Sequence, residues 1–131
     1  MDKLISPKLS YNINGILFNV HNERGQYCNE QQYCDAIEEY LKVSGLSYER
    51  EKVLPVSFKN EVEGRNKIDF LIQGLDGDII LEIKAKKVVT KEDYYQVKRY
   101  LVAFDKKLGI LVNFHAKYIT PKRILNSSTN S

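Results

Sequence analysis

The sequence predicts an α/β domain in which a mixed β-sheet is flanked by helices. Two kinds of pattern support this prediction: apolar residues that recur at helical spacing, and short runs rich in Ile, Leu and Val that alternate as strands do. These segments follow one another in the order α-α-β-β-β-α-β-β, which favours a sheet covered by helices. A chain of 131 residues can bury one core, so we expect a single domain over residues 1–125 and a frayed polar tail over 126–131.

Three segments have the apolar spacing of amphipathic helices. The first covers residues 8–24, and Gly25 can end it. The second covers 29–44 with Gly45 as its stop, and the third covers 91–104. In each segment the apolar stripe faces the predicted core; the stripes comprise Ile13, Ile16, Leu17 and Val20, then Tyr33, Ile37, Tyr40 and Leu41, then Tyr94, Val97, Leu101 and Phe104.

Five strands are predicted between and after these helices. They cover residues 48–59, 67–73, 78–85, 108–114 and 118–125. The pair Asp76–Gly77 between the second and third strands is a strong signal for a two-residue hairpin turn. The sequence therefore predicts that these two strands are antiparallel neighbours.

Composition narrows the class of protein and of partner. The apolar fraction of 43% and the charged fraction of 28% are typical of a globular domain and exclude wholesale disorder. The net charge of +3 is compatible with a polyanionic partner. No apolar run approaches the roughly 18–20 residues that cross a bilayer, and the start MDKLISPKLS lacks the apolar core of a signal peptide. We expect a cytoplasmic protein without a membrane partner.

The predicted hairpin gathers charged side chains on one face of the sheet. With Asp76–Gly77 as the turn, Asp69 lies opposite Lys84 and becomes a diagonal neighbour of Glu82. The other face of the two strands is apolar and consists of Ile68, Phe70, Ile72, Ile79, Leu81 and Ile83.

Two carboxylates that converge beside a core repel each other unless a cation lies between them. Mg²⁺ suits such a pair, because it prefers oxygen ligands and leaves positions for water and phosphate. Lys84 beside that ion could steady or deprotonate a water, or neutralise charge in a phosphoryl transition state. The alternative is a solvated strand face with a weak surface ion pair.

Further polar residues lie where they could join this site. Glu30 falls within the apolar stripe of the second helix, where it either snorkels at the helix start or points into a polar site. Gln96 and Tyr100 are four residues apart and therefore lie on one side of the third helix. Four basic residues either form a solvated face or bind along a phosphate backbone. They are Lys86, Lys87, Lys98 and Arg99.

The set Asp69, then Glu82-x-Lys84, resembles the core of the PD-(D/E)XK nuclease superfamily. The stretch LEIKAKK followed by YYQVKRYLVAF is similar to one branch of it, the small prokaryotic GxxExxY proteins. Other matching stretches are LSYNINGILFNVHNERG, NEQQYCDAIEEYL, KIDFLI and LGILVNF. Two residues depart from the pattern: Tyr27 replaces the glycine of the branch's motif, which leaves Glu30 and Tyr33, and Ile68 replaces the proline of the superfamily's name.

The resemblance implies a restriction-endonuclease-like core in which Asp69 and Glu82 bind Mg²⁺, with Mn²⁺ able to substitute. It further implies that the backbone carbonyl of Ile83 binds the ion and that Lys84 lies beside the attacking water. Glu30 and His21 would reach the metal directly or through water. Gln96-x-x-x-Tyr100 is similar to an element with which several branches hold substrate or water.

The sequence therefore predicts a metal-dependent nuclease that hydrolyses phosphodiester bonds, with DNA as the expected substrate and a homodimer as one open assembly. Two alternatives remain at this point. One is a non-catalytic module on the same fold that binds nucleic acid or protein. The other is an enzyme that hydrolyses a different phosphate.

Overall fold

The computed structural model describes residues 6–126 of the chain. Within this range the order of elements is the predicted one, α-α-β-β-β-α-β-β. The elements are α1 (Pro7–Arg24), α2 (Glu30–Ser44), β1 (Tyr48–Val53), β2 (Lys67–Ile72), β3 (Ile79–Lys84), α3 (Lys91–Ala103), β4 (Leu108–Asn113) and β5 (Lys122–Leu125). None of these helices combines the length and apolar composition that crossing a bilayer requires.

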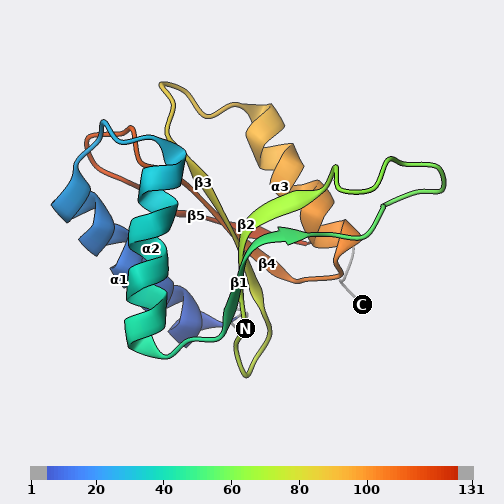
Figure 1. The fold of residues 1–131 in the computed structure, drawn as a ribbon, viewed down its shortest axis with the longest axis horizontal. Coiled ribbons are helices and arrows are strands. Elements are labelled where there is room, and N and C mark those ends of the chain that lie inside the picture. Colours follow the sequence, from blue (N-terminus) through green and yellow to red (C-terminus); the bar gives the residue numbers. More distant parts are fainter. Residues whose placement is uncertain (1–5, 127–131) are drawn as a thin grey trace, which may run out of the picture.

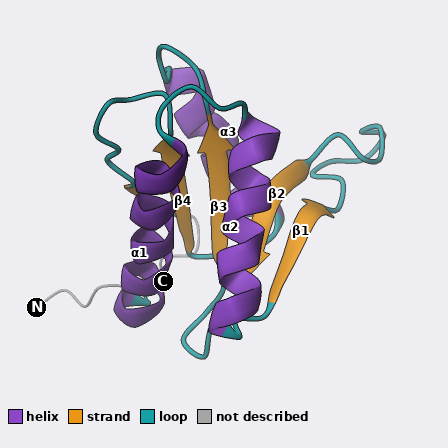
Figure 2. Cartoon of the chain, turned by 60° about the vertical axis from the view of Figure 1, so that its left-hand side comes forward, coloured by secondary structure: helices purple, strands orange, loops and turns teal. Residues whose placement is uncertain are grey.

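The five strands form one mixed sheet in the order β1-β2-β3-β4-β5. Strands β3 and β4 are parallel, and every other neighbouring pair is antiparallel. Helices α1 and α2 cover one face of the sheet and α3 covers the other (Figures 1 and 2). The predicted α/β architecture, a mixed sheet flanked by helices, is confirmed.

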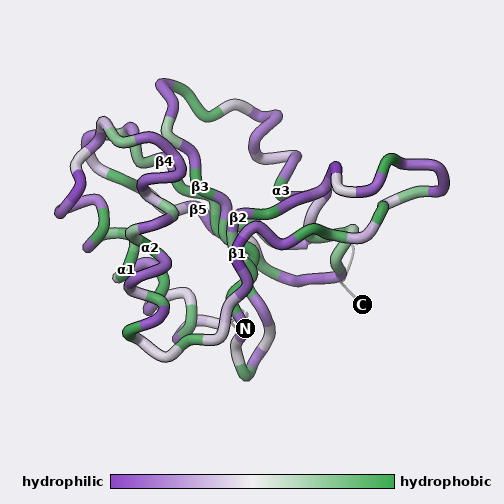
Figure 3. The backbone as a smooth tube through the Cα atoms, in the orientation of Figure 1, coloured by the Kyte–Doolittle hydropathy of each residue, from purple (hydrophilic) through white to green (hydrophobic). Residues whose placement is uncertain are grey.

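Two hydrophobic clusters hold the three layers together. The larger joins α1 and α2 to the sheet, and the smaller joins α3 to the opposite face. Hydrophobic stretches lie at the centre of the molecule, where the strands overlap in the view of Figure 3. Because β3 contributes to both clusters, this strand is almost fully buried, and a charged residue within it is held by the core on both sides.

Capping boxes fix the starts of α2 and α3, the two helix ends that lie next to the charged residues of the sheet. At α2, the Gln32 N–H donates to Asn29 Oδ1 at 2.8 Å and the Asn29 N–H donates to Gln32 Oε1 at 2.9 Å. Asn29 is therefore the cap, and Glu30 is the first helical residue. At α3, the Thr90 N–H donates to Asp93 Oδ2 at 2.8 Å.

The predicted register of the β2–β3 hairpin is wrong by two residues. Phe70 lies opposite Leu81, and the turn spans Gly74 to Gly77, whose N–H donates to the Gly74 carbonyl at 3.3 Å. Helix α1 packs closely against this turn: a Cβ on Gly74 would lie 2.5 Å from Leu9 Cδ2. A shift of two residues by itself does not turn a side chain to the other face of the sheet.

Three element ends also differ from prediction. Strand β1 stops at Val53, and residues 54–66 form a loop that projects from the body (Figure 1). Strand β5 begins at Lys122, after a loop. Asn126 was expected in the frayed tail, but it is buried and its amide donates to the Lys106 carbonyl at 2.9 Å. Residues 127–131 lie outside the described range.

The predicted apolar face of the hairpin is interrupted at one residue. Ile68 packs in the α3 cluster, whereas Phe70 and Ile72 pack in the cluster under α1 and α2. The break falls at Asp69, and the neighbouring strand is distorted at the same level, where Glu51 has a φ of 54°. The strict alternation predicted for β2 therefore ends where the polar site begins.

The close approach of α3 to β4 generates the first prediction. A Cβ on Gly109 would lie 2.7 Å from Val97 Cγ1, a stiff β-branched neighbour on α3. Gly109→Ala should therefore lower the free energy of unfolding by about 1–3 kcal/mol, the usual result of overpacking, in urea denaturation. Gly15→Ala is the control: no atom lies within 4 Å of its Cβ, so a helical alanine should stabilise by up to about 1 kcal/mol. Equal effects of the two substitutions would contradict this packing.

Candidate active site

The site is a fork where β2 and β3 separate. The last paired residues of the two strands are Phe70 and Leu81. Beyond this pair, two side chains accept hydrogen bonds from the backbone in place of the neighbouring strand. The Asp69 N–H donates to Glu82 Oε1 at 2.8 Å, and the Ile83 N–H donates to Asp69 Oδ2 at 2.7 Å. Buried N–H groups need hydrogen-bond partners. Each carboxylate therefore accepts a hydrogen bond from an N–H group that does not pair with the neighbouring strand. The fork thus brings Asp69 and Glu82 together, as predicted, through contacts that the sequence did not predict.

Burial, and to a lesser extent nearby negative charge, disfavours the ionised form of both carboxyl groups. Glu82 is 4% exposed, and burial, followed by the charge of Asp69, raises the pKa of Glu82 to about 8. Burial is also the main cause that raises the pKa of Asp69, with the charge of Glu30 adding to it. The N–H of Asp69 and the charge of Lys84 act in the opposite direction on Glu82 without reversing the shift.

The donor set fits a hard divalent cation. Among residues 6–126, one oxygen of each carboxylate, Asp69 Oδ1 and Glu82 Oε2, accepts no hydrogen bond. A cation held by these oxygens would favour the ionised form of both groups and so oppose the effect of burial on their pKa values. Within the described residues, no group of three or more His, Cys, Asp or Glu side chains is close enough to enclose an ion. An ion at the fork would therefore have two carboxylate ligands at most from this set of side chains, and its other ligands would be backbone, water or substrate.

Lys84 points from the same face of β3 toward α3. Its Nζ donates to Gln96 Oε1 at 3.2 Å and lies 3.9 Å from Asp93 Oδ1. The side chain of Lys84 is 16% exposed, so its contacts to α3 hold it in a defined position beside the fork. Gln96, predicted as a site residue, thus contacts Lys84.

Glu30 and Tyr100 border the fork from the two helix layers. Glu30 is exposed at the start of α2, and its charge contributes to the raised pKa values of Asp69 and Glu82. Tyr100 is buried on α3, where burial and then the charge of Glu82 raise its pKa. The structure therefore brings four of the predicted residues around Glu82: Asp69, Lys84, Glu30 and Tyr100.

Other predicted residues have different surroundings. His21 Nε2–H donates to the Ala116 carbonyl at 2.8 Å, which ties its ring to the β4–β5 loop. Lys86 Nζ is 2.6 Å from Asp93 Oδ2, and Lys98 Nζ donates to the Leu125 carbonyl at 2.7 Å. Arg99 and Lys87 are exposed. Of the four predicted phosphate-tracking cations, two are thus engaged by the protein itself.

Two residues next to the site were not predicted. Asp93 is buried; it caps α3, pairs with Lys86 and lies near Lys84. Asn113 lies opposite Lys84 and joins the strand ends, since its Nδ2–H donates to the Lys86 carbonyl at 2.7 Å. The pattern Thr90-x-x-Asp93 is a capping-box signal that could have identified the first. No local signal identifies the second, because its role depends on the pairing of β3 with β4.

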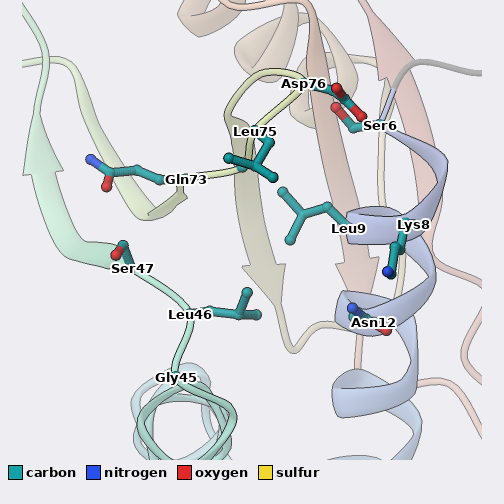
Figure 4. A pocket seen from close by; sticks show the side chains of 11 residues that line it. Ser6, Lys8, Leu9, Asn12, Gly45, Leu46, Ser47, Gln73, Leu75 and Asp76 are labelled. Carbon is teal, nitrogen blue, oxygen red and sulfur yellow. The ribbon is translucent and has the colours of Figure 1, made fainter.

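A cavity among the described residues lies away from the fork. It has a volume of about 500 Å³ between the start of α1, the α2–β1 link and the β2–β3 turn. Leu9 and Leu75 face each other across it (Figure 4). This cavity is at the turn end of the β2–β3 hairpin, whereas the fork is at the open end, and neither Asp69 nor Glu82 lines it. The chemistry of the carboxylates is therefore separate from this cavity.

The raised pKa of Glu82 makes the stability of the metal-free protein depend on pH. The folded state keeps a proton that the unfolded chain releases above its ordinary pKa of 4.5. Stability should therefore fall as the pH rises from that value toward about 8, by at most about 1.4 kcal/mol per pH unit for one proton. Glu82→Gln should flatten this dependence. Urea denaturation of both proteins with a chelator, from about pH 5 to pH 8, measures it. Parallel curves for the two proteins would refute the shift.

Comparison with known proteins identifies the family. The family model of the PD-(D/E)XK nuclease superfamily matches residues 7–124. The crystal structure of SSO0001 resembles this fold with a TM-score of 0.55 and 24% sequence identity, over 73% of this chain and 49% of that chain. This chain thus spans about half the length of that protein, and the likeness concerns the fold alone. No curated protein matches. Since the family model covers almost all of the described residues, the chain belongs to the PD-(D/E)XK nuclease superfamily and has its restriction-endonuclease-like fold.

Proposed function

We propose that this protein is a metal-dependent nuclease that hydrolyses phosphodiester bonds of nucleic acid, with DNA as its substrate and Mg²⁺ or Mn²⁺ as its cofactor. The observation that carries the proposal is the pair of carboxylates at the fork: burial raises the pKa of both groups, and the charge of Asp69 raises that of Glu82 further. Membership of a superfamily whose members are usually nucleases supports it.

Asp69 and Glu82 would hold the ion through the two oxygens that accept no hydrogen bond among residues 6–126. The Ile83 carbonyl, between Glu82 and Lys84, and Glu30, through water, are further proposed ligands. His21 is engaged by Ala116, and we leave it out of the proposed set. When bound, such an ion supplies Lewis acidity toward the phosphate and lowers the pKa of a water.

Lys84 is the proposed cation that stabilises charge on the phosphate or orients the attacking water. Gln96 holds its Nζ at 3.2 Å, and the carboxylate of Asp93 lies behind it at 3.9 Å. Tyr100, which is buried on α3 and whose pKa is raised by burial and then by the charge of Glu82, is the proposed residue that would border the site on the α3 side. In this arrangement Asp93 and Gln96 act through Lys84 and position it.

We also propose that the chain belongs to the GxxExxY branch of the superfamily. Glu30 and Tyr33 match the motif, and their surroundings suit two separate roles. Glu30 acts on the carboxylates of the fork, whereas the Tyr33 hydroxyl donates to the Gly25 carbonyl at 2.6 Å and holds the α1–α2 linker.

The test is cleavage of labelled DNA and RNA, each as a single strand, a blunt duplex and a duplex with overhangs, with Mg²⁺ or Mn²⁺. We expect metal-dependent cleavage of at least one substrate, and a loss of about 10²–10³-fold in rate for Lys84→Met, as is usual when one charge-stabilising group is removed. Metal affinity should be retained in this variant, because Lys84 is not a ligand.

Lys42→Met is the matched control, since it removes one lysine from the exposed end of α2. Its cleavage rate should equal that of the unmodified protein. If the protein binds metal and nucleic acid yet cleaves no substrate of the panel, the enzyme proposal fails and a non-catalytic binding module remains.

A further inference from the structure

The α1–α2 linker (residues 25–29) and the β4–β5 loop (residues 114–121) are fastened to each other. Gln26 Nε2–H donates to the His115 carbonyl at 3.0 Å, and His21 Nε2–H donates to the Ala116 carbonyl at 2.8 Å. The Tyr27 ring meets the His115 ring edge-on, with centroids 6.1 Å apart. The two loops, almost ninety residues apart in sequence, lie side by side at the upper left of Figure 1.

The buried core beneath also fixes these loops. The Tyr33 hydroxyl donates to the Gly25 carbonyl at 2.6 Å and accepts from the Cys28 N–H at 3.2 Å, so it holds the linker on both sides of Tyr27. The Tyr33 ring stacks on Phe114 at 4.3 Å between centroids. Ile119 is buried in the same cluster and anchors the far part of the β4–β5 loop. The shape of the two loops is therefore set before any ligand binds.

Two tyrosines stand out from this fixed base. Tyr27 is 84% exposed and Tyr118 is 77% exposed. The Nζ of Lys117 lies 5.5 Å from the centre of the Tyr118 ring. Large aromatic rings are costly to expose to water, yet here they occupy loops that the protein holds rigidly. We call these two rings and Lys117 the tyrosine platform.

The platform adjoins the candidate active site. The Phe114 N–H, at the start of the β4–β5 loop, donates to the Lys84 carbonyl at 2.8 Å. Glu30, whose charge acts on Asp69 and Glu82, directly follows the α1–α2 linker. A strand that reaches the fork therefore has the platform at the same end of the sheet.

The loops around the platform suit a polyanion, whereas the first turns of α2 and α3 beside them carry Glu30 and Asp93. The α1–α2 linker, the β3–α3 link (residues 85–90) and the β4–β5 loop contain no Asp or Glu. They contain Lys86, Lys87 and Lys117, of which Lys86 is paired with Asp93. The β2–β3 turn at the opposite end contains Asp76 and leads into Asp78. Cations beside exposed rings are the combination that binds single-stranded nucleic acid, since rings stack on bases and cations follow phosphates.

We propose that the tyrosine platform stacks on unpaired bases and selects single strands, or duplex ends with unpaired nucleotides, as the substrate of this site. Bases inside a duplex are already stacked and offer no free ring face, so a blunt duplex cannot use the platform. This proposal rests on the proposed nuclease function, because that function is what identifies the partner as a nucleic acid. It adds which form of nucleic acid the site accepts and gives Tyr27, His21 and Tyr118 a shared role.

The test is fluorescence anisotropy with a labelled single strand of about 20 nucleotides and the matching blunt duplex, in a Lys84→Met background so that the strand is not cut. Tyr27→Ala with Tyr118→Ala should weaken single-strand binding about tenfold or more, in line with the contribution of base stacking, and leave the duplex unchanged. Tyr27→Phe with Tyr118→Phe should restore binding, because phenylalanine keeps the ring face.

Tyr11→Ala is the matched control: Tyr11 is 79% exposed and lies ten residues, about 15 Å, before His21 along α1. Its binding should equal that of the parent. The proposal is overturned if the alanine pair binds the single strand as tightly as the parent, if Tyr11→Ala weakens binding equally, or if the parent binds no strand. A change in self-association without a change in strand binding would also overturn it and assign the rings to a contact between copies.

These readouts separate the two proposals. Platform-dependent strand binding by a protein that cleaves nothing would refute the nuclease and keep the platform. If the double alanine variant cleaves every substrate at the rate of the unmodified protein, the nuclease proposal stands and the platform proposal is refuted.

Discussion

The structure depends on how two buried N–H groups are satisfied where β2 and β3 part. In a continuous ladder each would donate to a backbone carbonyl, but here the Asp69 N–H donates to Glu82 and the Ile83 N–H donates to Asp69. Each carboxylate thereby gains a structural role that holds it in the core despite its charge. One oxygen of each accepts from the backbone and the other accepts no hydrogen bond among residues 6–126, so the hydrogen bonds that satisfy the sheet leave one oxygen of each carboxylate for a cation.

The surrounding elements act on this pair from three directions. Gly109 lets α3 approach the sheet closely, and from α3 Gln96 and Asp93 hold Lys84 beside Glu82. From α2, the capping box at Asn29 sets where Glu30 begins the helix. From β4, Asn113 and Phe114 bind the end of β3 and start the loop that carries Tyr118. The two carboxylates of the fork, Lys84 and the tyrosine platform therefore lie at one end of the sheet.

Sequence reasoning predicted the elements and the shared face of Asp69, Glu82 and Lys84, and a register error did not spoil this result. The reason is that the error was two residues, and side chains alternate with a period of two. The direct bridge between Asp69 and Glu82 was missed, because the turn length was inferred from Asp76–Gly77 without the packing of Leu9 against Gly74. The contact of His21 with Ala116 joins residues 95 positions apart and follows only from the tertiary structure. Local patterns thus predicted that Asp69, Glu82 and Lys84 lie near one another, and long-range packing decided how they touch.

The central claim is that the fork holds a cation in exchange for a proton. Calorimetric titration with Mn²⁺ near pH 7, in buffers with different heats of protonation, counts the protons released on binding. Because burial and Asp69 raise the pKa of Glu82 to about 8, we predict release of about one proton per ion near neutral pH, and no release from Glu82→Gln. Binding without proton release, or no binding at all, would contradict the account.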